Sequence, residues 1–321
     1  MKAYQFDTPA EGLVQVDLES PRPGPGEVLL DVHAAGLCHS DIHILHGTDG
    51  NWLRKRPIVL GHEVAGVVHA LGEGVVDVQI GDRVAVALIS HPIDTADALK
   101  APGLGCDGGY AQQMVVSADV LVAVPDAVSM AQAAVATDSI ATAYHAVVTE
   151  AEIGPGMRVA IIGLGGLGLN GVRVAALREA TVYGVDIDPT TFDAARAQGA
   201  SDCFTSITDV PRPVDVIVDF AGMGTTTADA VARVKWGGRV VVVGLGSARA
   251  EISSHALVTR NIRLQGSLGA SRDELEAVLA LIADGSLTPG LEQVPFDSVP
   301  EALERLSQGK VSGRLYTEPN A

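Results

Sequence analysis

The segment GLCHSDIHILHG (residues 36–47) concentrates side chains that can bind a metal ion or transfer a proton. These are Cys38, His39, Ser40, Asp41, His43 and His46. A thiolate and an imidazole are ligands that Zn²⁺ accepts, and a hydroxyl together with an imidazole can pass a proton to water. The segment alone is compatible with a metal site, a proton relay or a polar loop rich in histidine. The rest of the chain must decide among these.

A second motif, GLGGLG (residues 163–168), fits the pattern G-x-G-x-x-G. It directly follows the apolar run RVAII and opens a stretch with helical periodicity, which is the context that a dinucleotide-binding turn requires. The first glycine permits the tight turn, the second lets a pyrophosphate approach the backbone, and the third lets the helix pack close to the sheet. The helix N-terminus then supplies N–H groups to the phosphates. The predicted coenzyme turn consists of Gly163, Gly165, Gly166, Leu167 and Gly168.

Asp186 ends the next apolar run, where a carboxylate can accept hydrogen bonds from the hydroxyls of the adenosine ribose. Ile187 and Asp188 follow it, and no Lys or Arg occurs before Arg196. A 2′-phosphate would meet two carboxylates and no cation, so we expect NAD(H) to be preferred over NADP(H). The structural alternatives are a glycine-rich turn that binds nothing and a solvated carboxylate at a strand end.

The pattern of the sequence changes near residue 140, which predicts two domains. Residues 1–138 alternate short β-like runs with Gly and Pro, a pattern typical of a mostly antiparallel sheet. Residues 139–266 alternate apolar runs with helical stretches, which predicts a doubly wound parallel sheet of the α/β class. Residues 267–321 are predicted to return to the first domain.

Composition limits the classes of partner. The 321 residues carry a formal net charge of −17, whereas nucleic acid and anionic membranes both attract a basic surface. The N-terminus lacks the apolar core of a secretory leader, and the longest apolar run is interrupted by glycines, Asn170 and Arg173. The three scattered cysteines suit free thiols or metal ligands in a reducing compartment. We therefore expect a cytoplasmic protein that binds neither nucleic acid nor a membrane.

With a nicotinamide-binding domain predicted, the chain resembles the zinc-dependent medium-chain alcohol dehydrogenases over nearly its whole length. The resemblance is carried by the motifs GLCHSDIH, GHEVAGVV, GDRV, DGGYAQ, TDSIATAYHA, GLGGLG and GRVVVVG. It implies a GroES-like catalytic domain formed by residues 1–138 and 267–321, with a Rossmann domain inserted at residues 139–266. Such an insertion accounts for the interruption of the first domain that the composition indicates.

The resemblance implies that Cys38, His62 and Asp138 hold one catalytic zinc ion. A thiolate, a carboxylate and a neutral imidazole together balance the charge of Zn²⁺. The resemblance further implies that Glu63 lies near the metal and that Asp41 orients His62. A helix N-cap is the competing interpretation of Asp138, and a small core residue is that of Cys38.

The same resemblance implies a proton relay from the substrate hydroxyl through Ser40, the nicotinamide ribose and His43 to water. A turn residue and a surface histidine are the simpler interpretations of these two. Thr142 would lie beside the nicotinamide ring, and Arg314 would contact the pyrophosphate. His39 stands where many relatives have an arginine at the pyrophosphate, so that contact would be weaker and dependent on pH.

Many relatives hold a second, structural zinc with four closely spaced cysteines after GDRV. This chain has one cysteine in that segment, Cys106, and one thiol cannot build a tetrahedral site. We expect a metal-free surface loop there, although an improvised site can be drawn from His91, Asp94, Asp97 and Cys106. Because this lobe lies near subunit contacts in relatives, both a homodimer and a homotetramer remain open.

These features together predict a zinc-dependent enzyme that transfers a hydride between NAD(H) and a primary or secondary alcohol, or the corresponding aldehyde or ketone. Trp52 and Leu88 are predicted to line the substrate pocket, with core packing as the alternative. Two other functions remain open: a reductase of the same fold acting on a conjugated C=C bond, and a nucleotide-binding paralogue without activity. Intact Ser40 and His43 favour the alcohol dehydrogenase over the C=C reductase.

Overall fold

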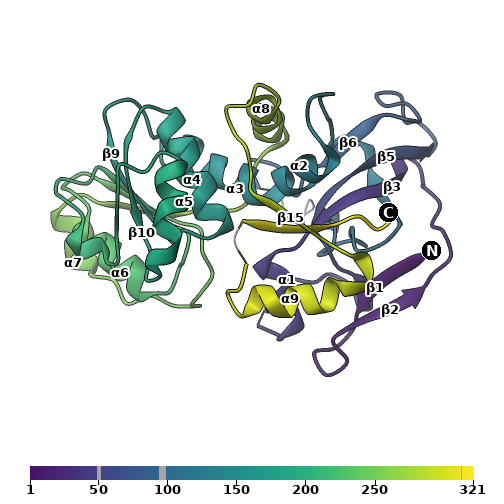
Figure 1. The fold of residues 1–321 in the computed structure, drawn as a ribbon, viewed down its shortest axis with the longest axis horizontal. Helices are drawn as coiled ribbons and strands as arrows, with labels where there is room; N and C mark the ends of the chain where they lie inside the picture. The colour runs from purple at the N-terminus through teal and green to yellow at the C-terminus, as the bar shows by residue number, and fades with distance from the viewer. Residues whose placement is uncertain (49–51, 94–98, 312) are drawn as a thin grey trace. The chain divides into compact units, whose positions relative to one another are not determined.

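The computed structural model describes residues 1–48, 52–93, 99–311 and 313–321. These residues form two compact units, Met1–Ala141 with Ala270–Ala321, and Thr142–Gly269. The first unit has two sheets and the second has one (Figure 1). None of the described helices is long and apolar enough to span a membrane.

A mostly antiparallel sheet of seven strands organises the first unit. The strand order is β15-β16-β3-β5-β6-β8, and β7 also pairs with β3. The bounds are β3 (Glu27–Gly36), β5 (Glu63–Leu71), β6 (Arg83–Val86), β7 (Gln113–Ser117), β8 (Leu121–Ala123), β15 (Leu291–Val294) and β16 (Arg314–Thr317). A smaller sheet joins β2 (Leu13–Asp17), β1 (Lys2–Phe6) and β4 (Ile58–Val59) in that order. Because β16 pairs with β3, the end of the chain completes the sheet that its beginning starts.

Strand β3 shows why these residues form a sheet with a core on one side. In its sequence EVLLDVHAAG, Val28, Leu30 and Val32 are buried in the main core at every second position, whereas His33 on the other face is exposed; Leu29 and Ala34 on that face are also buried. Alternation of this kind is the period of a strand whose one face packs on the core. The same core includes Phe6 from the smaller sheet, so the two sheets share their apolar interior.

The helices of the first unit connect these strands. They are α1 (His39–Leu45), the 3-10 turn η2 (Ala118–Val120), α2 (Met130–Val135), the π-helical turn η3 (Ala136–Ile140), α8 (Arg272–Ala283), the 3-10 turn η7 (Phe296–Ser298) and α9 (Val299–Ser307). Helix α2 begins with a capping box in which Ser129 accepts from the backbone of Gln132. Helix α8 begins in the same way at Ser271 and Glu274. Both helix starts are therefore encoded locally.

The second unit is a parallel sheet of six strands in the order β11-β10-β9-β12-β13-β14. The strands are β9 (Arg158–Ile162), β10 (Thr181–Val185), β11 (Asp202–Phe204), β12 (Val216–Asp219), β13 (Arg239–Val242) and β14 (Arg263–Gly266). The helical segments are α3 (Ala141–Tyr144), which crosses the division between the units, η4 (His145–Glu150), α4 (Gly166–Leu177), η5 (Pro189–Thr191), α5 (Phe192–Ala197), η6 (Ile207–Asp209), α6 (Thr225–Arg233) and α7 (Ser254–Thr259). The strands β9 (RVAII) and β12 (VIVD) are almost wholly buried, as expected of a parallel sheet covered on both faces.

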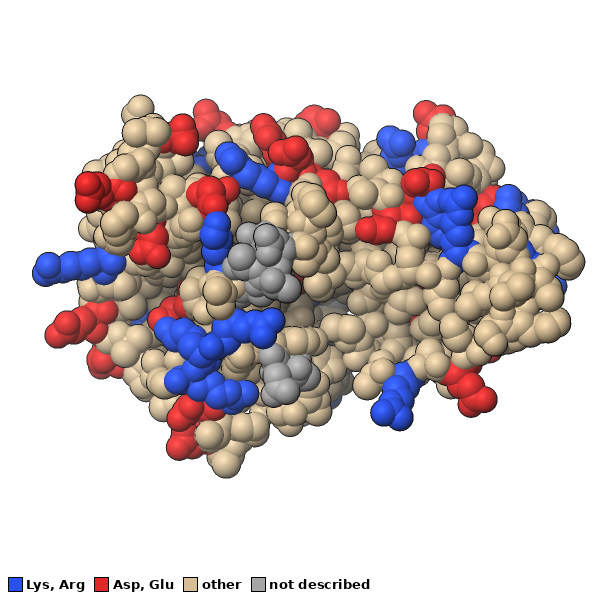
Figure 2. Space-filling view, turned by 180° about the vertical axis from the view of Figure 1, so that it is seen from behind, with Lys and Arg blue, Asp and Glu red and all other residues tan. Residues whose placement is uncertain are grey.

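The chain runs outward from β9 to β11, returns to β12, and runs outward again to β14. The carboxyl ends of β9 and β12 therefore flank the point at which the strand order reverses, where sheets of this kind bind ligands. The predicted α/β class is confirmed, with a mostly antiparallel first unit and a doubly wound second unit. On the face shown in Figure 2, acidic side chains are spread widely and basic ones occur singly or in one small group.

Candidate active site

Pairing of β3 with β5 brings Cys38 and His62 together. The last residue of β3, Gly36, is the partner of the first residue of β5, Glu63. Cys38 follows β3 by two residues and His62 precedes β5 by one, so both side chains come from the same end of this pair. A Cβ atom on Gly36 would lie 1.8 Å from Oε2 of Glu63, so the glycine leaves the space that this carboxylate occupies.

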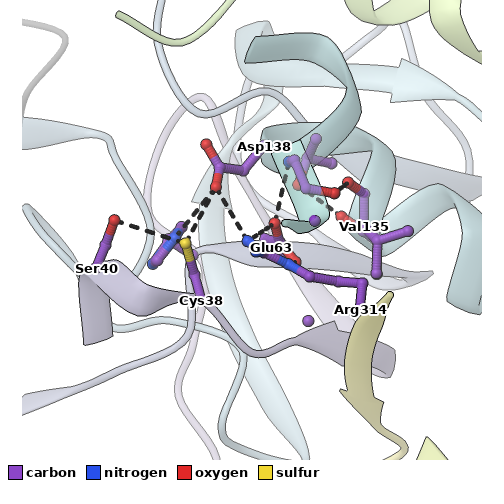
Figure 3. A network of polar contacts seen from close by, with 12 residues as sticks. Cys38, Ser40, Glu63, Val135, Asp138 and Arg314 are labelled. Carbon is purple, nitrogen blue, oxygen red and sulfur yellow. Dashed lines mark hydrogen bonds and ion pairs between the residues drawn. The ribbon is translucent and has the colours of Figure 1, made fainter. Parts of the chain in front are cut away.

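Asp138 reaches the same place from the π-helical turn η3. The next residue, Ser139, donates its backbone N–H to Oε1 of Glu63 (3.1 Å) and its hydroxyl to the carbonyl of Val135 (2.9 Å), as Figure 3 shows. The widened turn therefore redirects a backbone donor from the helix to a buried carboxylate, and π-turns often occur at functional sites. Asp138 lies inside the continuous helical segment from α2 to η3, so the helix N-cap interpretation of this residue is wrong.

The three predicted zinc ligands converge. Oδ2 of Asp138 lies 3.4 Å from Sγ of Cys38 and 3.6 Å from Nε2 of His62, and the three ligand atoms lie within 4.8 Å of one another. Tetrahedral coordination by S, N and O atoms at ordinary zinc distances places neighbouring ligand atoms about 3.3–3.7 Å apart. The donor types and their spacing therefore fit Zn²⁺. No other described group of three His, Cys, Asp or Glu side chains has this arrangement.

The carboxylate of Asp41 lies beside the imidazole of His62, and both side chains are buried. Its Oδ1 lies 3.3 Å from Nδ1 of His62, while its Oδ2 accepts from the hydroxyl of Tyr110 (2.7 Å) and from the N–H of Cys38 (3.1 Å). A proton on Nδ1 directed at this carboxylate leaves Nε2 free to bind a metal. Burial lowers the pKa of the His62 imidazole, but the charges of Asp41 and Cys38 outweigh this and hold that pKa well above its usual range.

Arg314 places a permanent positive charge beside the carboxylates of Glu63 and Asp138. Its Nε donates to Oε2 of Glu63 (3.0 Å), and one terminal nitrogen donates to Oε1 of Glu63 and to Oδ2 of Asp138 (3.3 Å; Figure 3). Burial raises the pKa of Glu63 to about 7, with the charge of Asp138 acting in the same direction and Arg314 opposing them. The predicted pyrophosphate contact of Arg314 remains a prediction, and the structure places its guanidinium among buried carboxylates, 5% exposed.

The predicted relay residues lie next to the ligand cluster on helix α1. Oγ of Ser40 lies 3.6 Å from Sγ of Cys38, and His43, three residues later, shares that helix face. Nδ1 of His43 lies 3.1 Å from Oγ1 of Thr48, and its ring meets that of Trp52 edge-on with centroids 6.1 Å apart. Trp52 is half-buried, and so is Leu88 beyond the end of β6. His39 and His46 are exposed.

The coenzyme turn in the second unit has the expected backbone geometry. Gly163 has a φ of +85°, in the left-handed region that favours glycine. A Cβ atom on Gly168 would lie 1.7 Å from the carbonyl oxygen of Gly163, so only glycine lets α4 approach the turn this closely. Gly165, the N-cap of α4, has no atom within 4 Å of the place of a Cβ, which leaves its surface open to a ligand. Gly166 and Leu167 form the first turn of α4.

The side chain of Asp186 is hydrogen-bonded to the backbone of this turn. Its Oδ2 accepts from the N–H of Leu164 (2.7 Å), and its Oδ1 accepts from the N–H of Asp188 (2.9 Å). The next cation along the chain, Arg196, makes ion pairs with Asp193 and Asp202. Thr142 is buried in α3, at the start of the second unit.

Several residues of the site were missed by sequence reasoning. Three residues without a predicted role form hydrogen bonds to predicted site residues: Tyr110 to Asp41, Ser139 to Glu63, and Thr48 to His43. Tyr110 belongs to the motif DGGYAQ and Ser139 to TDSIATAYHA, so their motifs were the available signal. In the shortened lobe, Sγ of Cys106 donates to the carbonyl of Lys100 (3.3 Å). Asp94 and Asp97 of the improvised site lie outside the described residues.

Comparison with known proteins agrees with this geometry. Residues 24–126 match the family model described as alcohol dehydrogenase GroES-like domain, and residues 166–284 match the one described as zinc-binding dehydrogenase. An alcohol dehydrogenase from Geobacillus stearothermophilus is 30% identical over 335 residues, covering 98% of each chain.

Solved structures of dehydrogenases and reductases also superpose on this chain. The structure of acetophenone reductase from Geotrichum candidum in complex with NAD superposes with a TM-score of 0.90 at 34% identity, covering 99% of this chain and 96% of that chain. An alcohol dehydrogenase from Aeropyrum pernix superposes with a TM-score of 0.90 at 27% identity, covering 99% and 100%. The chain therefore belongs to the zinc-type medium-chain dehydrogenase/reductase family and is an oxidoreductase with a GroES-like domain and a Rossmann-type domain.

Proposed function

We propose that this protein is a zinc-dependent alcohol dehydrogenase or carbonyl reductase that uses NAD(H). Its substrates are primary or secondary alcohols and the corresponding aldehydes and ketones. The observation that carries the proposal is the convergence of Cys38, His62 and Asp138, with His62 oriented by Asp41. The alcohol dehydrogenases and the acetophenone reductase to which the chain is similar support the substrate class.

Zinc at this site would act as a Lewis acid that polarises the oxygen of the substrate and lowers the pKa of an alcohol. The two anionic ligands, Cys38 and Asp138, balance its charge, while His62 binds as the neutral imidazole. Arg314 offsets the charge of Glu63, so this third carboxyl group, after Asp41 and Asp138, can stay buried beside the proposed ligands without repelling them.

Ser40 and His43 remove the proton that the alcohol loses. The Ser40 hydroxyl, beside Cys38, accepts the proton of the alcohol and gives up its own proton toward His43, which releases a proton to solvent from its half-buried position on the same helix face. Thr48, at Nδ1 of His43, orients the imidazole. We propose that Trp52 and Leu88 line the pocket that receives the substrate.

In the second unit, the glycine turn and the N-terminus of α4 would hold the pyrophosphate of NAD(H), which would supply or accept the hydride. Asp186 selects NAD(H) because a 2′-phosphate would meet its carboxylate and that of Asp188. We propose that residues 1–138 and 267–321 form the catalytic domain and residues 139–266 the coenzyme domain. We also propose that Thr142 contacts the nicotinamide, and that His39 and Arg314 act at the pyrophosphate.

We further propose one zinc ion per chain, because the lobe that carries Cys106 has no second thiol to complete a structural site. We also propose that the protein is cytoplasmic and forms a homodimer or a homotetramer.

The test combines zinc per chain with turnover on a panel of alcohols and ketones. About one zinc ion per chain, with zinc-dependent oxidation of alcohols by NAD, is the expected result. Zinc without turnover of any alcohol or ketone would favour a C=C reductase or a paralogue without activity. Activity with NADH that survives complete removal of zinc would overturn the zinc-dependent mechanism.

A further inference from the structure

The second unit contains a buried carboxylate that the proposed mechanism does not use. Asp219 is the last residue of β12 and is 0% exposed. Its Oδ1 accepts from the N–H groups of Ala221 (3.1 Å) and Gly222 (2.9 Å), and its Oδ2 accepts from the hydroxyls of Thr226 (2.7 Å) and Thr227 (2.8 Å). Burial of a carboxylate is costly unless hydrogen bonds replace its water. These donors all come from the loop and helix that follow β12, so the carboxylate fixes the shape of that connection.

The turn that Asp219 holds packs directly against the coenzyme turn. In the sheet, Asp219 is the partner of Ile162, the residue before Gly163. The N–H of Phe220 donates to the carbonyl of Ile162 (2.8 Å), and a Cβ on Gly163 would lie 3.0 Å from the nitrogen of Ala221. The backbone of the coenzyme turn therefore packs directly against the backbone of residues 220–222, with no side chain between them.

The same turn also contacts the helix that faces the pyrophosphate and the loop after β13. A Cβ on Gly171, in α4, would lie 2.6 Å from the ring of Phe220. The carbonyl of Asp219 accepts from the N–H groups of Val243 (2.9 Å) and Gly244 (3.1 Å), and a Cβ on Gly222 would lie 1.8 Å from the oxygen of Gly244. Close-packed backbones of this kind leave little freedom to adjust, so a shift of the 220–222 turn must be transmitted to the coenzyme turn.

We propose that Asp219 is a positioning residue for coenzyme binding: its buried carboxylate holds the 220–222 turn against Gly163 and thereby sets the position of the phosphate-binding backbone. The inference rests on the proposed function, because it takes NAD(H) as the ligand of that turn. Asp219 itself is enclosed and touches no coenzyme. Its effect is on the geometry of other groups, where small misplacements have large consequences for binding.

Asp215 offers a matched control at the opposite end of the same strand. It directly precedes β12, accepts from the N–H of Arg158 (2.6 Å) and forms an ion pair with Lys235 (2.5 Å). These contacts lie at the amino ends of the parallel strands, whereas the coenzyme turn lies at the carboxyl ends. Asp215→Asn therefore removes a structural carboxylate from β12 without changing the 220–222 turn.

The experiment is a fluorescence titration of the zinc-loaded enzyme with NADH, for the wild type, Asp219→Asn and Asp215→Asn. In either orientation of its amide, Asp219→Asn replaces one carboxylate oxygen by a nitrogen that cannot accept, so one of the two pairs of donors loses its acceptor and the turn loosens. We expect its Kd for NADH to rise about tenfold, its KM for NAD to rise more than its kcat falls, and its zinc content to be unchanged. For Asp215→Asn we expect a Kd within about twofold of wild type. An unchanged Kd in Asp219→Asn, or an equal loss in both variants, would overturn the inference.

Thr227→Val keeps the test decisive where Asp219→Asn fails to fold. It preserves the carboxylate and the volume of the side chain, and removes one donor from Oδ2. A Kd for NADH about threefold above wild type is expected, and an unchanged Kd would overturn the inference. The wild-type titration tests the proposed function separately. A wild type that binds neither NADH nor NADPH contradicts that function, whereas a wild type that binds normally beside variants that also bind normally contradicts only the role of Asp219.

Discussion

Arg314 in the C-terminal strand donates hydrogen bonds to both carboxylate oxygens of Glu63, 251 residues earlier in the chain. Both side chains are buried, and the same guanidinium also reaches Asp138. Removing the cation from such a cluster leaves buried negative charge without compensation. The end of the chain is therefore tied to the ligand cluster by charge as well as by the β3–β16 pairing.

We expect Arg314→Gln to lower the free energy of unfolding by about 3–5 kcal/mol, because it removes the buried cation that faces the carboxylates of Glu63 and Asp138. The measurement is urea unfolding followed by circular dichroism. Arg305→Gln is the control, since it breaks an ion pair with Glu292 in which both side chains are well exposed, and we expect a change below about 1 kcal/mol. The double variant Glu63→Gln with Arg314→Gln should regain part of the loss. Equal stability of Arg314→Gln and Arg305→Gln would contradict this account.

The second prediction concerns Asp138 as a metal ligand. Asp138→Asn preserves the shape of the side chain but removes the charge that faces Cys38 and His62, so zinc per chain should fall well below the wild-type value. Asp138→Cys should retain zinc, because a thiolate supplies the same charge. Elemental analysis after dialysis makes the measurement, and Asp126→Asn, a fully exposed position, is the control. Unchanged zinc in Asp138→Asn would remove this residue from the ligand set.

The third prediction concerns pH and the thiol of Cys106. Burial, with the charge of Asp107 acting in the same direction, raises the pKa of Cys106 to about 11. The thiolate is the reactive form, so alkylation by iodoacetamide should be slow at pH 8 and should accelerate about tenfold per pH unit up to about pH 10. Mass spectrometry of the peptide that contains Cys106 reports the rate. Asp107→Asn should shift the profile to lower pH, whereas levelling near pH 8.5, as for an ordinary thiol, would contradict the raised pKa.

Much of the fold could be predicted because its signals are local. Periodicity and glycine turns identified the parallel sheet of the second unit, and the strand before GLGGLG runs through Arg158–Ile162 in the structure. The proposed ligands Cys38 and His62 stand in motifs next to strand ends, and strand pairing then brings them together. Motifs of this kind can be read from one sequence because the chemistry depends on residue type and spacing.

The parts that could not be predicted depend on contacts between distant segments. The backbone N–H of Ser139 donates to the side chain of Glu63, 76 residues away, instead of to a carbonyl of its own helix. No local sequence pattern predicts the π-helical turn in which it lies. Arg314 was assigned to the pyrophosphate alone, since its sequence context gives no sign of the carboxylates around it. Asp219 ends an ordinary apolar strand, and its role depends on how three turns pack against one another.

The last prediction concerns Tyr110, whose hydroxyl donates to Oδ2 of Asp41, the carboxylate that orients His62. Burial raises the pKa of Tyr110 well above its usual value, with Asp41 acting in the same direction, so the phenol remains a donor throughout the working pH range. Tyr110→Phe removes that hydrogen bond and leaves the ring, so Asp41 should hold His62 less firmly. Partners of this kind contribute about 10–100-fold to metal affinity, and we expect about a tenfold loss, measured by competition with a chromogenic chelator. Tyr316→Phe, on the half-buried position of β16, serves as the control and should leave the affinity unchanged. Equal zinc affinities in the two variants would mean that Asp41 orients His62 without help from Tyr110.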